Sequence, residues 1–85
     1  MQIQVLSTTD QDFREKFTGR VFEVDFSDGL QPITTQDANG EEYTFSPTSV
    51  IREDGQVLNP ETLAVEDVLI LSSDKFVVRA EVVLV

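Results

Sequence analysis

Short runs in which apolar and polar residues alternate dominate the chain, and each run predicts a β-strand. The clearest run occupies residues 19–29, where Phe22, Val24 and Phe26 point to one face and the residues between them to the other. A period of two is typical of a strand that buries one face. A turn at residues 27–29 is expected to close this strand.

The period changes between residues 7 and 19, which indicates a short helix after a first strand at residues 2–6. Phe13 and Phe17 are four positions apart, so they share one helix face and are expected to pack on the sheet. The end signals, in chain order, are a cap at Ser7, Thr8 or Thr9, the acids Asp10 and Asp12 in the first turn, the bases Arg14 and Lys16 in the last turn, and a stop at Gly19. Acidic side chains in the first turn of a helix and basic side chains in the last turn interact favourably with the helix dipole.

A hairpin is predicted around Asn39-Gly40, because these residues tolerate the positive φ that such turns require. The segment before it, residues 30–36, contains Pro32, which cannot donate a ladder hydrogen bond. A loop or an edge strand is therefore expected there. The segment after the turn, residues 41–46, alternates as a strand does.

Beyond this hairpin, Pro47 marks a corner in the chain. Apolar residues resume at 48–53, a turn is predicted at Asp54-Gly55, and residues 56–59 are expected to return as a short strand. Asn59 followed by Pro60 is a good helix start, so one helical turn is expected there. Residues 39–55 are therefore first of all a scaffold hairpin with a corner. The acidic residues at the edge of this hairpin leave open a second role in contacting a partner.

Two strands joined by a tight turn at residues 72–74 are predicted for residues 66–85. From Val82 onward both faces of the last strand are apolar, and neither a charge nor a proline protects its end. An exposed edge strand normally carries such protection. Either this strand lies inside the sheet, or its second face, with Val83 and Val85, contacts another chain.

The elements add up to six or seven short strands, one short helix near the N-terminus and a helical turn near residue 61, in a single domain of residues 1–85. The expected fold class is mainly β: a small, strongly bent sheet or a barrel, because closure hides strand edges. The order strand, turn, strand, proline corner, strand over residues 19–53 resembles SH3-like small barrels, in architecture only. The alternative is an α+β, β-grasp-like arrangement, which the opening strand suggests, but the helix follows it too early.

Composition narrows the class of protein. The 85 residues include no cysteine and no histidine, which excludes disulfides and thiolate or imidazole metal sites. The N-terminus lacks the basic start and apolar run of a signal peptide, and no apolar run approaches the roughly 20 residues of a membrane helix. We therefore expect a cytoplasmic protein that makes no membrane contact.

Charge is the strongest compositional signal. The formal net charge is −10, from 16 acidic and 6 basic side chains. Residues 21–74 carry twelve acids and one base, Arg52, so this middle segment holds the whole excess. Phosphate contacts need lysine and arginine, so direct binding to nucleic acid is not expected. The segment either serves solubility or forms a charged binding face.

The sequence contains no recognisable catalytic set. No histidine activates a serine or threonine, and the four glycines are isolated, so no loop can cradle a phosphate. Glu23 and Asp25 share a strand face at about 7 Å spacing, but nothing else marks them as an acid–base pair. The acidic turns lack the spacing of a calcium loop. We expect no enzyme activity, no catalytic residue, no metal site and no cofactor.

The function expected is that of a small acidic protein-interaction module: an accessory, adaptor or inhibitory subunit, of the kind that phages and mobile elements encode. Its partner would be a protein with a basic surface. The candidate contact residues are the acids Glu23, Asp25, Asp28, Glu41, Glu42, Glu53 and Asp54. One alternative is a DNA mimic, whose carboxylates take the place of phosphates and block a DNA-binding protein. Another is a structural subunit of an assembly, with Val83 and Val85 as a homo-oligomer interface, although a monomer is slightly favoured.

Overall fold

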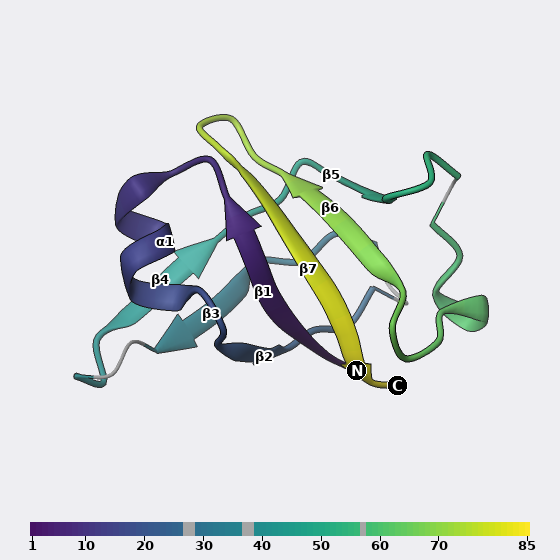
Figure 1. Cartoon of the computed structure of the whole chain (residues 1–85), viewed down its shortest axis with the longest axis horizontal. Helices are drawn as coiled ribbons and strands as arrows, with labels where there is room; N and C mark the ends of the chain where they lie inside the picture. Colours follow the sequence, from purple (N-terminus) through teal and green to yellow (C-terminus); the bar gives the residue numbers. More distant parts are fainter. Residues whose placement is uncertain (27–28, 37–38, 57) are drawn as a thin grey trace.

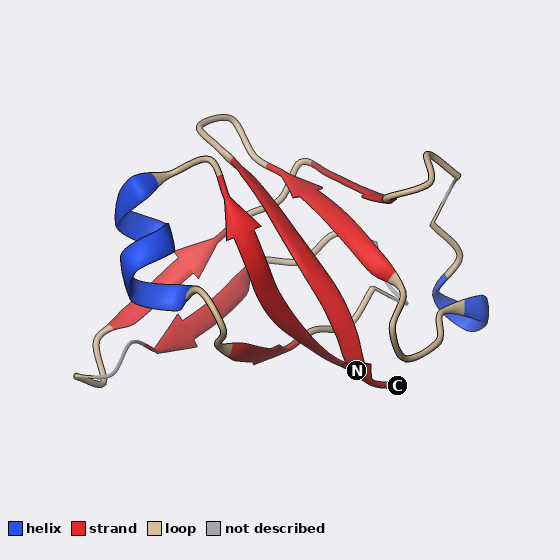
Figure 2. Cartoon of the chain, viewed as in Figure 1, coloured by secondary structure: helices blue, strands red, loops and turns tan. Residues whose placement is uncertain are grey.

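The computed structural model describes residues 1–26, 29–36, 39–56 and 58–85 (Figures 1 and 2). In chain order its elements are β1 (Gln2–Thr8), α1 (Gln11–Phe17), β2 (Val21–Glu23), β3 (Ile33–Gln36), β4 (Glu42–Phe45), β5 (Ser49–Arg52), the 3-10 helix η1 (Pro60–Thr62), β6 (Val68–Ser72) and β7 (Val77–Leu84). The mainly β fold class is therefore confirmed. Neither of the two described helices has the length and apolar character needed to cross a membrane.

The strands form two antiparallel sheets. The larger sheet has the order β2-β1-β7-β6-β5, and β3 pairs with β4 in a separate two-stranded sheet that lies behind it in Figure 1. β2 and β5 are the edges of the larger sheet and are not hydrogen-bonded to each other, so over the described residues the sheet is not closed as a barrel. Of the predicted forms, the structure has the small bent sheet. It does not have the α+β alternative, because α1 contributes only seven residues.

The last strand, β7, lies in the interior of the larger sheet. It pairs with β1 on one edge and with β6 on the other, and its inward residues Val78, Ala80 and Val82 are buried. The interior position explains why this strand carries no edge protection. On the outward side Val83 is half-buried, and Val85 beyond the strand end is exposed. Their role as an oligomer interface stays a prediction.

The buried residues form one core cluster to which both sheets and α1 contribute. Its members are Ile3, Val5, Phe13, Phe17, Phe22, Val24, Phe26, Ile33, Phe45, Val50, Leu63, Leu69, Leu71, Val78, Ala80 and Val82. Phe22, Val24 and Phe26 all belong to it, as their alternation predicts, although the strand itself ends at Glu23. The buried face therefore continues beyond the hydrogen-bonded part of β2.

Aromatic rings connect the two sheets at one end of this core. The ring centroid of Phe13 lies 4.7 Å from that of Phe17, 5.6 Å from Tyr43, 6.0 Å from Phe45 and 5.1 Å from Phe76. These partners come from α1, β4 and the turn before β7, so one ring joins three segments. Each such pair adds about 0.5–1.5 kcal/mol beyond area burial. The predicted packing of Phe13 and Phe17 against the sheets is confirmed.

The start of α1 differs from the prediction. β1 continues past a bulge as far as Thr8, so Ser7 and Thr8 are strand residues. The Thr9 hydroxyl accepts a hydrogen bond from a backbone N–H of β7 at 3.0 Å. Asp10 is the N-cap instead, and its carboxylate accepts from the Phe13 N–H at 2.9 Å. A cap at residues 7–9 was wrong, because strand pairing extends through them.

The return strand predicted for residues 56–59 is also absent from the described part of that segment, which leaves out Val57. β5 pairs with β6, which is distant in sequence, and the Arg52 N–H reaches only the Gln56 carbonyl, at 3.4 Å. A longer-range partner therefore replaces the local hairpin. The helical turn at Pro60 is confirmed as η1.

The predicted β3–β4 hairpin is confirmed. Its last pair is Gln36 with Glu42, and Gly40 in the connection has a φ of +81°. Pro47 follows β4, and β5 then joins the other sheet, so the chain crosses between sheets at this corner. The turn expected at residues 27–29 lies outside the described residues except for Gly29.

Replacing Gly40 by valine should destabilise the fold by about 1–2 kcal/mol, because a β-branched residue disfavours positive φ. A Cβ atom at this position meets nothing within 4 Å, so the cost would come from the backbone alone. Urea denaturation measures it. Gly40→Asn is the control and should cost less, since asparagine tolerates this region. Equal stability of the valine variant and the wild type would contradict the turn.

Replacing Phe13 by alanine should lower the free energy of unfolding by about 3–5 kcal/mol, which approaches the whole stability expected of a small domain. Thermal and urea denaturation should therefore show a lost or strongly shifted transition. Val65→Ala is the control, because Val65 is 51% exposed, and it should change stability by less than about 0.5 kcal/mol. Similar effects of the two substitutions would contradict a central role for the Phe13 ring.

Candidate functional site

The acidic candidates are placed in three separate regions. Glu41 and Glu42 lie at the start of β4, at one end of the long axis, and Glu53 and Asp54 follow β5 towards the other end (Figure 1). Glu23 and Asp25 lie near the chain termini, in and after β2. Asp28 lies outside the described residues. The fold therefore does not gather these acids on one face.

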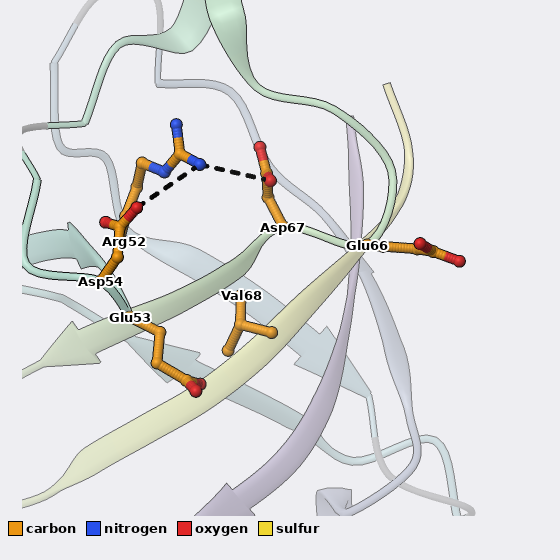
Figure 3. Close-up of a pocket in the computed structure, with 6 residues that line it drawn as sticks. All are labelled: Arg52, Glu53, Asp54, Glu66, Asp67 and Val68. Atoms are coloured by element: carbon orange, nitrogen blue, oxygen red, sulfur yellow. Dashed lines mark hydrogen bonds and ion pairs between the residues drawn. The ribbon is translucent and has the colours of Figure 1, made fainter.

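The densest of these regions is built where β5 ends and β6 begins. The antiparallel pairing of β5 with β6 brings the turn after Arg52 next to the turn before Val68. A hollow of about 330 Å³ lies between them, lined by Arg52, Glu53, Asp54, Glu66, Asp67 and Val68 (Figure 3). We call the five charged residues of this set the acidic corner. It holds four carboxylates and one guanidinium.

Arg52 stands at the centre of the acidic corner. Its Nη2 lies 3.8 Å from Asp54 Oδ2 and 3.5 Å from Asp67 Oδ1, so one guanidinium joins the two turns (Figure 3). Asp67 also accepts a hydrogen bond from the Ala64 N–H at 2.9 Å, and Asp54 accepts one from the Gln56 N–H at 3.0 Å. Two of the four carboxylates are thus held in fixed positions.

Glu53 is oriented differently, towards the outer face of the larger sheet. Its Oε2 accepts a hydrogen bond from Arg79 Nε at 2.6 Å, which links the end of β5 to β7 across β6. This hydrogen bond and the charge of Glu53 raise the pKa of Arg79. Both side chains are more than two-fifths exposed, and such a surface pair contributes little to stability.

Glu66 is the outermost member of the acidic corner. It has a φ of +81°, a conformation uncommon for a residue other than glycine. Its side chain is exposed and projects away from the other five residues in Figure 3. The sequence did not single out Glu66 and Asp67 as partner contacts. Only the pairing of β5 with β6 brings them next to Asp54, and no local signal in the sequence indicates that pairing.

A second hollow, of about 430 Å³, lies beside the chain termini. It is lined by Met1, Glu23, Val24, Asp25, Phe26, Glu61 and Val85. The N-terminal amine lies 3.0 Å from Glu23 Oε1. The hollow brings two acidic candidates together with Val85, the residue predicted for an oligomer contact. Its lining combines apolar and acidic side chains.

These groups suit recognition through ion pairs and hydrogen bonds. Within residues 1–26, 29–36, 39–56 and 58–85, no group of three or more His, Cys, Asp and Glu side chains could hold a metal ion. Two carboxylates of the acidic corner, those of Asp54 and Asp67, contact Arg52, and the residues that line the hollow include no serine, threonine, cysteine or lysine. The absence of catalytic residues stays a prediction.

Comparisons with known proteins do not identify a relative: no protein-family model, no curated protein and no solved structure matches the chain. Any role of the acidic corner must therefore be inferred from its own chemistry.

Replacing Asp67 by alanine should cost about 1–2 kcal/mol of stability, because it removes the acceptor for the Ala64 N–H and one partner of Arg52. Urea denaturation measures the change. Asp67→Asn should cost less, since its amide oxygen can still accept from Ala64. Asp74→Ala, in the exposed turn between β6 and β7, is the control and should be neutral. Equal stability for Asp67→Ala and Asp74→Ala would show that the acidic corner is not held as described.

Proposed function

We propose that the protein is a non-enzymatic interaction module that docks on a partner protein with a basic surface, as an accessory, adaptor or inhibitory subunit. The acidic corner is the proposed contact. The observation that carries this proposal is that Arg52 holds a carboxylate from each of two turns, Asp54 and Asp67, in a hollow that Glu53 and Glu66 also line. The formal charge of this cluster is negative, within a chain whose net charge is −10.

Preorganisation supports a binding role over a purely solubilising one. Asp54 and Asp67 are each held by Arg52 and by a backbone N–H. Fixed side chains lose less conformational entropy when a partner binds. A localised negative field also steers a basic partner and accelerates the encounter.

The DNA-mimic alternative has less support from the arrangement of the acids. A mimic needs carboxylates aligned along one surface, whereas Glu41 and Glu42 lie at the opposite end of the long axis from Asp54 (Figure 1). The acids also share their surroundings with Arg52 and Arg79. A local contact therefore fits better than an extended imitation of a phosphate backbone.

The proposal is tested by reversing charge at the two ends separately. Asp54→Lys with Glu66→Lys changes the acidic corner, and Glu41→Lys with Glu42→Lys makes the same change in net charge at the hairpin. Partner proteins would be captured from a lysate of the source cells at low salt. Their rates of association with the wild type and with each variant would then be measured by surface plasmon resonance. We expect at least tenfold slower association for the corner variant, and a smaller change for the hairpin variant.

Raising the salt concentration should weaken the wild-type interaction, because exposed charges are screened over about 10 Å at 0.1 M salt. Circular dichroism would confirm that both variants keep their fold. Equal losses in the two variants would indicate a general effect of net charge. Unchanged binding by the corner variant would exclude the acidic corner as the contact.

A further inference from the structure

The turn between β3 and β4 contains a reactive pair of residues that the proposed contact does not use. Of the two asparagines in the chain, only Asn39 precedes a glycine, Gly40. Both residues of this pair are exposed. A Cβ atom built on Gly40 meets nothing within 4 Å, so open space surrounds the backbone here. Glycine also has no side chain to shield its own backbone nitrogen.

The turn can open without disturbing the core. In the part of the chain that the structure describes, β3 and β4 pair only with each other, and their last pair before the turn is Gln36 with Glu42. A two-stranded hairpin is marginally stable by itself. The ring of Tyr43, which lies 5.6 Å from Phe13 and 5.4 Å from Phe17, fixes the hairpin only beyond this last pair. Local opening therefore gives the exposed turn the backbone freedom that a cyclisation needs.

We propose that Asn39-Gly40 is a site of spontaneous deamidation that loosens the β3–β4 hairpin. The backbone nitrogen of Gly40 attacks the side-chain carbon Cγ of Asn39, and the new C–N bond closes a five-membered succinimide ring. The side-chain NH₂ group leaves with the proton of the attacking nitrogen, as ammonia. Water then adds to one of the two ring carbonyls and breaks its C–N bond, and no atom is oxidised or reduced. Asparagine is among the thermolabile residues for this reason.

The ring opens to two products, which affect the hairpin differently. Both products add one negative charge beside the exposed Glu41 and Glu42. Opening at the former side-chain carbonyl gives aspartate, with a normal backbone. Opening at the main-chain carbonyl gives isoaspartate, in which the backbone passes through the side-chain carbon and is longer by one methylene. Turn geometry sets the register of a hairpin, so isoaspartate disturbs the pairing of β3 with β4.

The second asparagine of the chain is an internal control. Asn59 precedes Pro60, whose backbone nitrogen carries no hydrogen and therefore cannot form this succinimide with loss of ammonia. The Asn59 Oδ1 atom also accepts a hydrogen bond from the Glu61 N–H at 3.1 Å, as the cap of η1. Both asparagines experience the same solution in the same molecule, so a difference between their rates reflects their surroundings.

The reaction is tested by incubating the purified full chain for several weeks at neutral pH and physiological temperature. Peptide mapping by mass spectrometry follows the two asparagines, since each deamidation adds one mass unit. We expect loss of the amide to be at least tenfold faster at Asn39 than at Asn59, with isoaspartate among the products. Asn39→Gln should block the change, because its longer side chain closes a six-membered ring slowly. Equal rates at the two asparagines, or aspartate as the sole product, would overturn the proposed site.

The effect on the hairpin is measured on the isoaspartate form after chromatographic purification from the incubated chain. Asn39→Asp is the matched control, because it has the same charge and a normal backbone. We expect the isoaspartate form to unfold at a lower urea concentration than Asn39→Asp, and Asn39→Asp to unfold close to the wild type. Equal urea midpoints for the isoaspartate form and Asn39→Asp would overturn the loosening of the hairpin.

Discussion

The ring of Phe13 is the contact on which the arrangement of the two sheets depends. It lies within 6.0 Å, centroid to centroid, of rings from α1, β4 and the turn before β7. A seven-residue helix is marginal in water by itself, and so is an isolated two-stranded hairpin. Each is stabilised here by burying aromatic side chains against the other and against the larger sheet. Local propensity alone would form neither element.

The charged side chains are distributed unevenly over the surface of the molecule. Acidic side chains occupy the turns and the ends of the molecule, while arginines 52 and 79 lie between acids and hold them in place. The inward faces of the strands contain almost no polar group, with Thr8 as the buried exception among the described residues. The excess of negative charge is therefore carried by the turns and the ends of the molecule, and the core is left to apolar side chains.

The sequence predicts what depends on neighbouring residues and misses what depends on pairing at a distance. Alternation correctly indicated the buried side chains of Phe22 and Phe26, and the spacing of Phe13 and Phe17 correctly indicated one helix face. The helix cap was misplaced because a bulge lengthens β1. The return strand at residues 56–59 was wrong because β5 finds its partner in β6. Glu53 and Asp54 of the acidic corner were singled out as candidate contacts, but their position beside the turn of Glu66 and Asp67 was missed, since register between distant strands joins the two turns.

The interior position of β7 has a consequence for how the chain acquires its structure during synthesis. β1 can pair with β2 soon after both leave the ribosome, but its other edge is completed only by residues 77–84, and Gln2 lies opposite Leu84. Contacts so distant in sequence form slowly, because the intervening loop must be closed first. A nascent chain therefore presents the open second edge of β1 until residues 77–84 have been synthesised. During that interval it is exposed to chaperones, proteases and aggregation in a way that the finished domain is not.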